Sequence, residues 1–245
     1  MIIRGAFALL LLALSPGPPP AARAADAQPP VVVELFTSQG CSSCPPADAY
    51  LGELAQRPNL LALSFHVDYW NYIGWTDPFA TKFATERQRA YARQLNLRYI
   101  YTPQMVVNGT TQGIGSERAS IAELIAAAEA DRTPRPRVTV ARRPDGAIAI
   151  HVDAAAAAEP ATLWLVGFDR EHTTPVLRGE NEGQTLKDYQ VVRSWSRAGT
   201  WRGKALDLAV PADQVGGDGG VAVLLQQGDG AGRIIGAAML KSPVS

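Results

Sequence analysis

Apolar and polar positions follow two different spacings in the first half of the chain. Residues 31–36 and 60–67 are short apolar runs, a pattern typical of buried strands. Segments 44–54, 78–95 and 117–130 instead carry apolar side chains on one face at helical spacing. Because these strands and helices alternate, we expect a sheet that is covered by helices on both faces.

Two further strands are predicted at 99–107 and 110–113, separated by Asn108-Gly109, a dipeptide typical of tight turns. The predicted order up to residue 130 is therefore strand, helix, strand, helix, strand, strand, helix. A proline-rich segment at 133–136 is typical of a linker. We therefore expect a first domain over residues 25–133.

The second half of the chain has a different pattern, with many short apolar runs separated by Gly and Pro. This pattern favours a small, mainly antiparallel β-sandwich over residues 134–245. The expected strands are 138–141, 147–152, 162–168, 190–195, 206–210, 221–227 and 233–240.

The first residues have the features of an export signal. Arg4 precedes a short apolar core at 6–14, and Ala22-Arg23-Ala24 forms a small-residue cleavage pattern. The core is shorter than the roughly 20 residues that span a bilayer, although an uncleaved anchor is an alternative. We expect a signal peptide at 1–24 and a periplasmic or secreted protein that has no stable membrane insertion after cleavage.

Composition narrows the possible functions. The chain has 245 residues, of which 47% are hydrophobic, so it can fill a substantial core. Its formal net charge is zero and its basic residues are scattered. Nucleic-acid binding requires a basic face, so we expect no nucleic-acid partner.

The two cysteines of the chain, Cys41 and Cys44, form one C-x-x-C motif between a predicted strand and a predicted helix. A disulfide that closes so short a loop adds little stability, so the motif points to redox chemistry or metal binding. In an exported protein, a disulfide can form and persist. Cys41 at the helix N-terminus is the expected nucleophile, and Cys44, one turn later, is the expected resolving cysteine.

Two alternatives remain beside thiol–disulfide exchange. Thiolates select soft metals such as copper(I), and Cys41, Cys44 and His66 are then the candidate ligands. The second alternative is a non-catalytic binding module, in which the β-rich half of the chain carries the function. We expect no cofactor for exchange, and protein thiols or disulfides as its partners, with the redox partner unknown.

The arrangement of elements around the C-x-x-C motif resembles the thioredoxin fold. Segment 91–109, which contains Thr102-Pro103, resembles the thioredoxin segment that carries the cis-proline. Segments 34–48, 67–70 and 178–181 resemble a narrower group, an exported bacterial thioredoxin-like family known only as a domain of unknown function. The resemblance implies an α/β thioredoxin-like domain, followed here by the smaller β-sandwich-like domain, and a thiol–disulfide oxidoreductase.

The resemblance also implies roles for single residues. Pro103 is the expected cis-proline, and it exposes the backbone of Thr102 to an extended substrate; an ordinary trans-proline is the alternative. Glu34 is a candidate for the buried acid that relays a proton from Cys44. It stands seven residues before Cys41, one more than usual, so a structural glutamate is the alternative.

Two further groups of polar and aromatic residues have less specific interpretations. The aromatic residues that follow the second strand can form the floor of a peptide groove or pack onto the next helix; they are Tyr69, Trp70, Tyr72 and Trp75. A polar network between the two domains is the hypothesis for Arg178, Glu180, Asn181 and Arg193.

Overall fold

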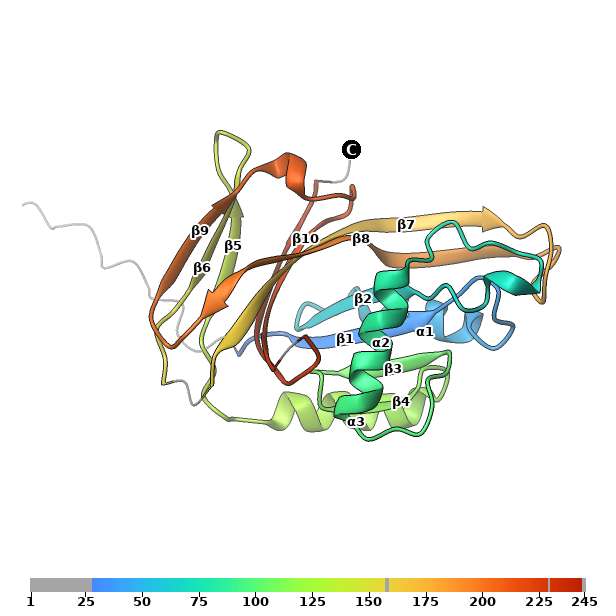
Figure 1. The fold of residues 1–245 in the computed structure, drawn as a ribbon, viewed down its shortest axis with the longest axis horizontal. Coiled ribbons are helices and arrows are strands. Elements are labelled where there is room, and N and C mark those ends of the chain that lie inside the picture. The colour runs from blue at the N-terminus through green and yellow to red at the C-terminus, as the bar shows by residue number, and fades with distance from the viewer. Residues whose placement is uncertain (1–27, 157–158, 229, 244–245) are drawn as a thin grey trace, which may run out of the picture.

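The computed structural model of the protein describes residues 28–156, 159–228 and 230–243. The predicted signal peptide, residues 1–24, lies outside these residues. Within them the chain forms one large sheet, one small sheet and three α-helices (Figure 1). None of the helices in the described part is long and apolar enough to cross a membrane.

The first half forms the alternating elements that its pattern predicts, although the strand expected at 99–107 covers only the last four of those residues. In chain order these are β1 (Val31–Thr37), α1 (Pro45–Leu54), β2 (Leu60–His66), the 3₁₀ turn η1 (Asn71–Ile73), α2 (Lys82–Gln94), β3 (Gln104–Val107), β4 (Thr111–Ile114) and α3 (Arg118–Ala130). Every residue of β1 and β2 is buried, and the two strands pair in parallel. β1 also pairs with β3, in the antiparallel direction.

Helix α2 begins four residues later than its pattern predicts. The Thr81 hydroxyl caps it by accepting from the Ala84 N–H at 3.1 Å. Asp77, which precedes the predicted start of this helix, accepts from the Gln39 N–H at 2.8 Å and contacts His66 Nδ1 at 2.7 Å. Its other carboxylate oxygen accepts from the Phe79 N–H at 2.9 Å, so Asp77 holds the segment before α2 against β2 and the turn at Gln39.

The second half is almost entirely β-structure. Its elements are β5 (Val138–Arg142), β6 (Ile148–Val152), β7 (Ala161–Pro175), β8 (Thr185–Trp201), β9 (Leu206–Val210), the 3₁₀ turn η2 (Ala212–Gln214), β10 (Gly220–Gln227) and β11 (Ile234–Lys241). β7 and β8 are 15 and 17 residues long and pair along their length, so they reach much further than the expected short strands.

The expected fold class, an α/β thioredoxin-like domain followed by a smaller sandwich-like domain, is wrong. The molecule is mostly β, and strands from both halves share one mixed sheet in the order β11-β10-β7-β8-β2-β1-β3-β4. The halves join where Ser64 of β2 pairs with Val191 of β8. Apolar periodicity identifies a strand without identifying the strand it pairs with, so the sequence did not predict this junction. The division at residues 133 and 134 stays a prediction.

A second, three-stranded antiparallel sheet, β5-β6-β9, packs on one end of the large sheet. Its inward side chains, including Ile148 and Ile150, share a core with Leu163 and Val223 of the large sheet. Figure 1 shows this small sheet at the end of the molecule opposite to the turn between β7 and β8.

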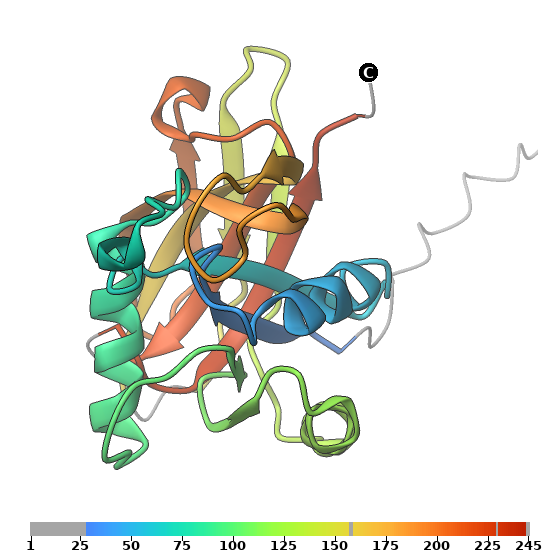
Figure 2. The same ribbon diagram turned by 90° about the vertical axis from the view of Figure 1, so that its right-hand side faces the viewer.

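The two faces of β1 contact different helices. Val33 and Leu35 pack against α1 and α3, whereas Val32 and Phe36 pack on the other face, with Tyr91 of α2. Figure 2 shows α2 on one side of the sheet and α1 and α3 on the other. This alternation of strand side chains decides which residues can reach the start of α1.

Candidate functional site

The C-x-x-C motif forms a tight turn between β1 and α1. The Cys41 N–H donates to the Ser38 carbonyl at 3.1 Å, and the Cys44 N–H donates to the Cys41 carbonyl at 3.2 Å. Cys44 is the N-cap of α1, and proline follows at the first helical position, where its missing N–H costs nothing. Cys41 and Cys44 form a disulfide, with their Cα atoms 5.5 Å apart.

Both sulfur-bearing residues are covered, whereas the serines between them are exposed. Cys41 is 1% exposed and Cys44 is fully buried. The Ser43 hydroxyl lies 3.3 Å from Cys41 Sγ. A substrate sulfur can therefore reach Cys41 Sγ only after neighbouring groups move.

The turn is covered by a loop from the other half of the chain, which we call the strap (residues 176–184, between β7 and β8). Asn181 Nδ2 donates to the carbonyls of Gln39 at 2.9 Å and Cys41 at 3.0 Å. Glu180 Oε2 accepts from the Ser42 N–H at 3.0 Å. Figure 2 faces the end of the molecule at which the strap lies beside the start of α1.

The expected polar network between the halves is thus formed by two of its four residues. Glu180 and Asn181 reach the C-x-x-C turn, while Arg178 is exposed. Arg193 Nε instead pairs with Asp169 Oδ2 at 3.3 Å, and its guanidinium lies over the Phe79 ring.

A buried group of three carboxylates and a histidine lies behind the turn. Gln39 joins two of the carboxylates, since its N–H donates to Asp77 and its Nε2 donates to Asp188 Oδ2 at 2.7 Å. His66 contacts Asp77 through Nδ1, and its buried Nε2 lies 3.8 Å from Asp188 Oδ1, beyond hydrogen-bonding distance. Asp48 of α1 is the third carboxylate.

The charges of this group differ from those of exposed side chains. Burial raises the pKa of Asp48 to about 8, and the charge of Asp188 acts in the same direction. Burial lowers the pKa of His66, but the charge and hydrogen bond of Asp77, together with the neighbouring carboxylates, raise it by more, and the pKa reaches about 9. At neutral pH, His66 is therefore protonated, and Asp48 holds a proton that it loses just above neutrality.

Glu34 lies on the other face of the sheet. Its carboxylate contacts Arg87 Nε at 2.7 Å and accepts from the Tyr91 hydroxyl. Strand alternation directs it toward α2, away from α1. Glu34 thus has a buried ion-pair partner, and its role as a proton relay stays a prediction. Asp48, which sequence reasoning missed, lies four residues after Cys44 on one helix face; that spacing was the available signal.

Thr102 and Pro103 stand at the same end of β1 as the cysteines. Phe36 pairs with Gln104, so Pro103 is opposite the last residue of β1. The Thr102–Pro103 peptide bond is cis. The Thr102 hydroxyl accepts from Trp70 Nε1 at 2.7 Å, and Trp70 in turn packs against Gly40.

Of the aromatic residues that follow β2, some pack within the protein and one is exposed, as a residue of a binding surface would be. Tyr69 donates to Gln88 of α2, and Trp75 Nε1 donates to Gln39 Oε1 at 3.1 Å, so both have structural partners. Tyr72 is 82% exposed and is free to contact another molecule.

Metal ligation at His66 has little geometric basis. Its Nδ1 is engaged by Asp77, and its partner cysteines are joined to each other. In the described part of the chain, no group of three or more His, Cys, Asp or Glu side chains is placed to hold a metal ion.

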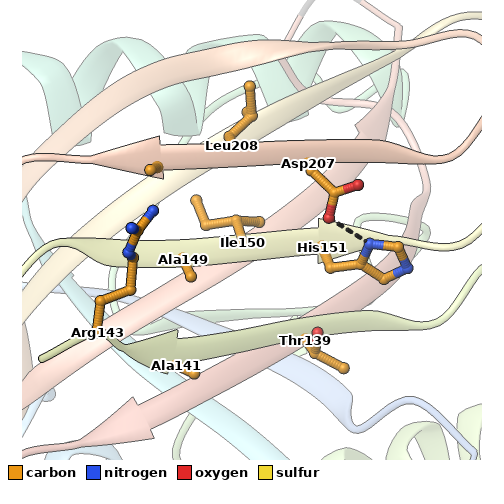
Figure 3. Close-up of a pocket in the computed structure, with 9 residues that line it drawn as sticks. Thr139, Ala141, Arg143, Ala149, Ile150, His151, Asp207 and Leu208 are labelled. Atoms are coloured by element: carbon orange, nitrogen blue, oxygen red, sulfur yellow. Dashed lines mark hydrogen bonds and ion pairs between the residues drawn. The ribbon is translucent and has the colours of Figure 1, made fainter.

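A shallow hollow of about 410 Å³ lies on the outer face of the small sheet (Figure 3). His151 lies at one side, between Asp207 at 2.7 Å and Asp153 at 2.9 Å, and Arg143 lies at the other. Both ring nitrogens of His151 therefore have carboxylate partners, one on the neighbouring strand β9 and one just after the end of β6.

Two solved structures are similar to this chain. A crystal structure of a protein from Agrobacterium tumefaciens is 33% identical with a TM-score of 0.78, covering 90% of this chain and 98% of that one. HBP35 of Porphyromonas gingivalis is 15% identical with a TM-score of 0.59, covering 88% of this chain and 76% of that one. The second likeness shows the fold alone.

A family model described as "Protein of unknown function (DUF1223)" matches residues 32–226. This range includes the C-x-x-C turn, the strap and the buried carboxylates. No curated protein matches the chain.

Proposed function

The chain belongs to the DUF1223 family, and we propose that it is an exported thiol–disulfide oxidoreductase whose Cys41–Cys44 disulfide exchanges with cysteines of other proteins. The observation that carries the proposal is the disulfide at the N-terminal end of α1. So short a loop contributes little to stability, whereas a helix N-terminus stabilises the thiolate that exchange requires.

The reaction moves two electrons and two protons. In the oxidising direction, a substrate thiolate attacks Cys41 Sγ, the Cys41–Cys44 bond breaks, and Cys44 leaves as a thiolate that takes up a proton. A second substrate thiolate then attacks the substrate sulfur of the mixed disulfide and releases Cys41. The reverse sequence reduces a substrate disulfide to two thiols.

Asp48 is suited to exchange the proton of Cys44. It lies one helical turn after Cys44 on the same face of α1, and such pairs have neighbouring side chains. Its pKa of about 8, raised by burial, lets it give or take a proton near neutral pH. In this proposal Asp48 has the role that the sequence suggested for Glu34.

The covered position of Cys41 requires a local opening for exchange. Reactive cysteines are partly exposed, but Cys41 is 1% exposed. Its exposed neighbours Ser42 and Ser43 mark the side from which a substrate approaches. Thr102 and Pro103, at the same end of the sheet, offer backbone to an extended substrate.

The proposed site of action is the periplasm or the outside of the cell. The export pattern at 1–24 supports it, since exported proteins meet oxidising conditions in which disulfides persist. The proposed partners are protein thiols or disulfides.

The test is a trapping experiment with purified protein and a cysteine-containing peptide. Cys44→Ser should accumulate a mixed disulfide between Cys41 and the peptide, and Cys41→Ser should trap far less. Absence of a disulfide that dithiothreitol reduces, together with no trapped species in Cys44→Ser, would rule the proposal out. Stoichiometric copper(I) bound by the reduced protein and lost in both variants would favour metal capture instead.

A further inference from the structure

The strap brings one negative charge to the backbone beside Cys41. Glu180 Oε2 accepts from the N–H of Ser42, the residue that follows Cys41. Asn181 holds this position, because its buried amide donates to the Cys41 carbonyl. The hydrogen bond from the Ser42 N–H lowers the pKa of Glu180, so the carboxylate is ionised at neutral pH.

This contact acts on the charge state of the neighbouring sulfur. A thiolate is stabilised by N–H donors and positive charge and is disfavoured by a nearby negative charge. Glu180 occupies one N–H of the turn and adds a negative charge there. The Ser43 hydroxyl, 3.3 Å from Cys41 Sγ, acts in the opposite direction, because it can donate to a thiolate.

We propose that the Glu180 carboxylate disfavours the Cys41 thiolate and thereby stabilises the Cys41–Cys44 disulfide relative to the dithiol. The inference rests on the proposed function and adds a direction to it. A pair whose disulfide is stabilised is a weaker oxidant and a better reductant. Glu180 therefore shifts the site toward reducing disulfides in its substrates.

Reduction of a substrate disulfide begins at Cys41. The Cys41 thiolate attacks one sulfur of the substrate disulfide, and the other substrate sulfur leaves and takes a proton. Cys44 then loses its proton and attacks Cys41 Sγ, which releases the second substrate thiol. Return of the disulfide to the dithiol requires two electrons from a donor protein that carries a dithiol of lower potential.

The test compares Glu180→Gln with Glu182→Gln in full-length protein, each equilibrated with glutathione redox buffers. Glu182 is a matched control, since it is exposed on the same strap and its substitution removes the same charge. Exposed charge contacts are worth little, so Glu180→Gln should make the disulfide about two- to fivefold easier to reduce at equilibrium. Glu182→Gln should match the wild type.

Two further measurements separate charge from structure. The pH midpoint for alkylation of Cys41 should fall in Glu180→Gln and rise in Ser43→Ala. Raising the salt concentration screens exposed charges, so it should shift the wild-type equilibrium toward the dithiol and shift Glu180→Gln less. The salt series on the wild type needs no variant to fold.

Equal equilibrium constants for Glu180→Gln and Glu182→Gln would overturn the inference. The thermal stability of Glu180→Gln, measured in the oxidised and in the reduced form, gives a second criterion. An equal loss of stability in both forms would show a structural role alone and would also overturn the inference. If the wild type exchanges no disulfides at all, the proposed function fails instead; trapping by Cys44→Ser with an unchanged equilibrium in Glu180→Gln rejects only the role of Glu180.

Discussion

At the scale of single residues, the site is governed by where charged side chains are buried. Asp48 and Glu34 are both buried carboxylates in the first half of the chain, but their surroundings differ. Glu34 faces the guanidinium of Arg87, which balances its charge. Burial, reinforced by the charge of Asp188, raises the pKa of Asp48 to about 8, so Asp48 keeps a proton at neutral pH. Two buried carboxylates on opposite faces of one sheet therefore differ in charge: Glu34 has a cationic partner, and Asp48 is protonated.

Asp48 should make the protein less stable as the pH rises. Its pKa is about 8 in the folded protein and near 3.8 when the chain is unfolded. Between these values the folded state binds more protons than the unfolded state, so the free energy of unfolding falls with pH, at a limiting slope of about 1.4 kcal/mol per pH unit for one proton. The raised pKa of His66, about 9, acts in the same direction above its unfolded value of 6.5.

Asp48→Asn should therefore flatten the stability profile between pH 5 and pH 8. Urea unfolding at several pH values measures this effect. Asp213→Asn, in which an exposed carboxylate is removed, is the control and should keep the wild-type slope. Parallel profiles for wild type and Asp48→Asn would contradict the assignment of the buried proton.

Glu34→Gln should lower the stability of the protein and leave thiol–disulfide exchange at Cys41 and Cys44 unchanged in the protein that remains folded. The substitution leaves the Arg87 charge buried and uncompensated, a change that costs about 3–5 kcal/mol. Urea unfolding measures the loss, with Glu86→Gln, on the exposed side of α2, as the control. If Glu34→Gln kept its stability but lost the exchange step of Cys44, Glu34 would be the proton relay after all.

At the scale of elements, the strap completes a turn that β1 and α1 leave unfinished. The carbonyls of Gln39 and Cys41 receive their hydrogen bonds from Asn181, about 140 positions further along the chain. Two long strands carry the strap to this place, because β7 and β8 extend beyond the small sheet (Figure 1).

Asn181→Ala should loosen the strap and expose the disulfide. Loss of a buried donor that serves two carbonyls costs about 1–3 kcal/mol. Reduction by dithiothreitol should become faster than in the wild type, because the covered Cys41 Sγ opens more often. Glu182→Ala, on the same strap, should leave the rate unchanged. An unaltered rate in Asn181→Ala would show that other groups limit access to the sulfur.

At the scale of the whole molecule, the two halves share their largest core. Phe65 of β2 lies in one cluster with Val166 of β7 and Leu224 of β10. Phe65 also packs against Trp195 of β8, with ring centroids 5.7 Å apart. A core built from both halves couples their stabilities.

We therefore expect one cooperative unfolding transition for the full chain. Tryptophan fluorescence and far-ultraviolet circular dichroism should have coincident urea midpoints. A fragment of residues 28–133 lacks Trp195 and the other side chains of the second half that pack around Phe65, so it should lack a cooperative transition. Two separate transitions, or a stably folded fragment, would show that the halves are independent domains.

The sequence alone determined the local features of this protein. The alternating strands and helices up to residue 130, the turn at Asn108-Gly109 and the position of the cysteines between β1 and α1 all follow from short-range patterns. These depend on side-chain spacing and backbone preferences, which act over a few residues. The spacing from Cys44 to Asp48 was also present in the sequence.

Only the tertiary structure decided which distant segments meet. Pairing of β2 with β8 merges the halves into one sheet, and it brings Asp188 and the strap to the C-x-x-C turn. Strand pairing uses backbone groups that every residue carries, so the sequence pattern does not specify the partner. The charge of the site depends on that choice, because carboxylates from separate segments become buried neighbours only when the chain has folded.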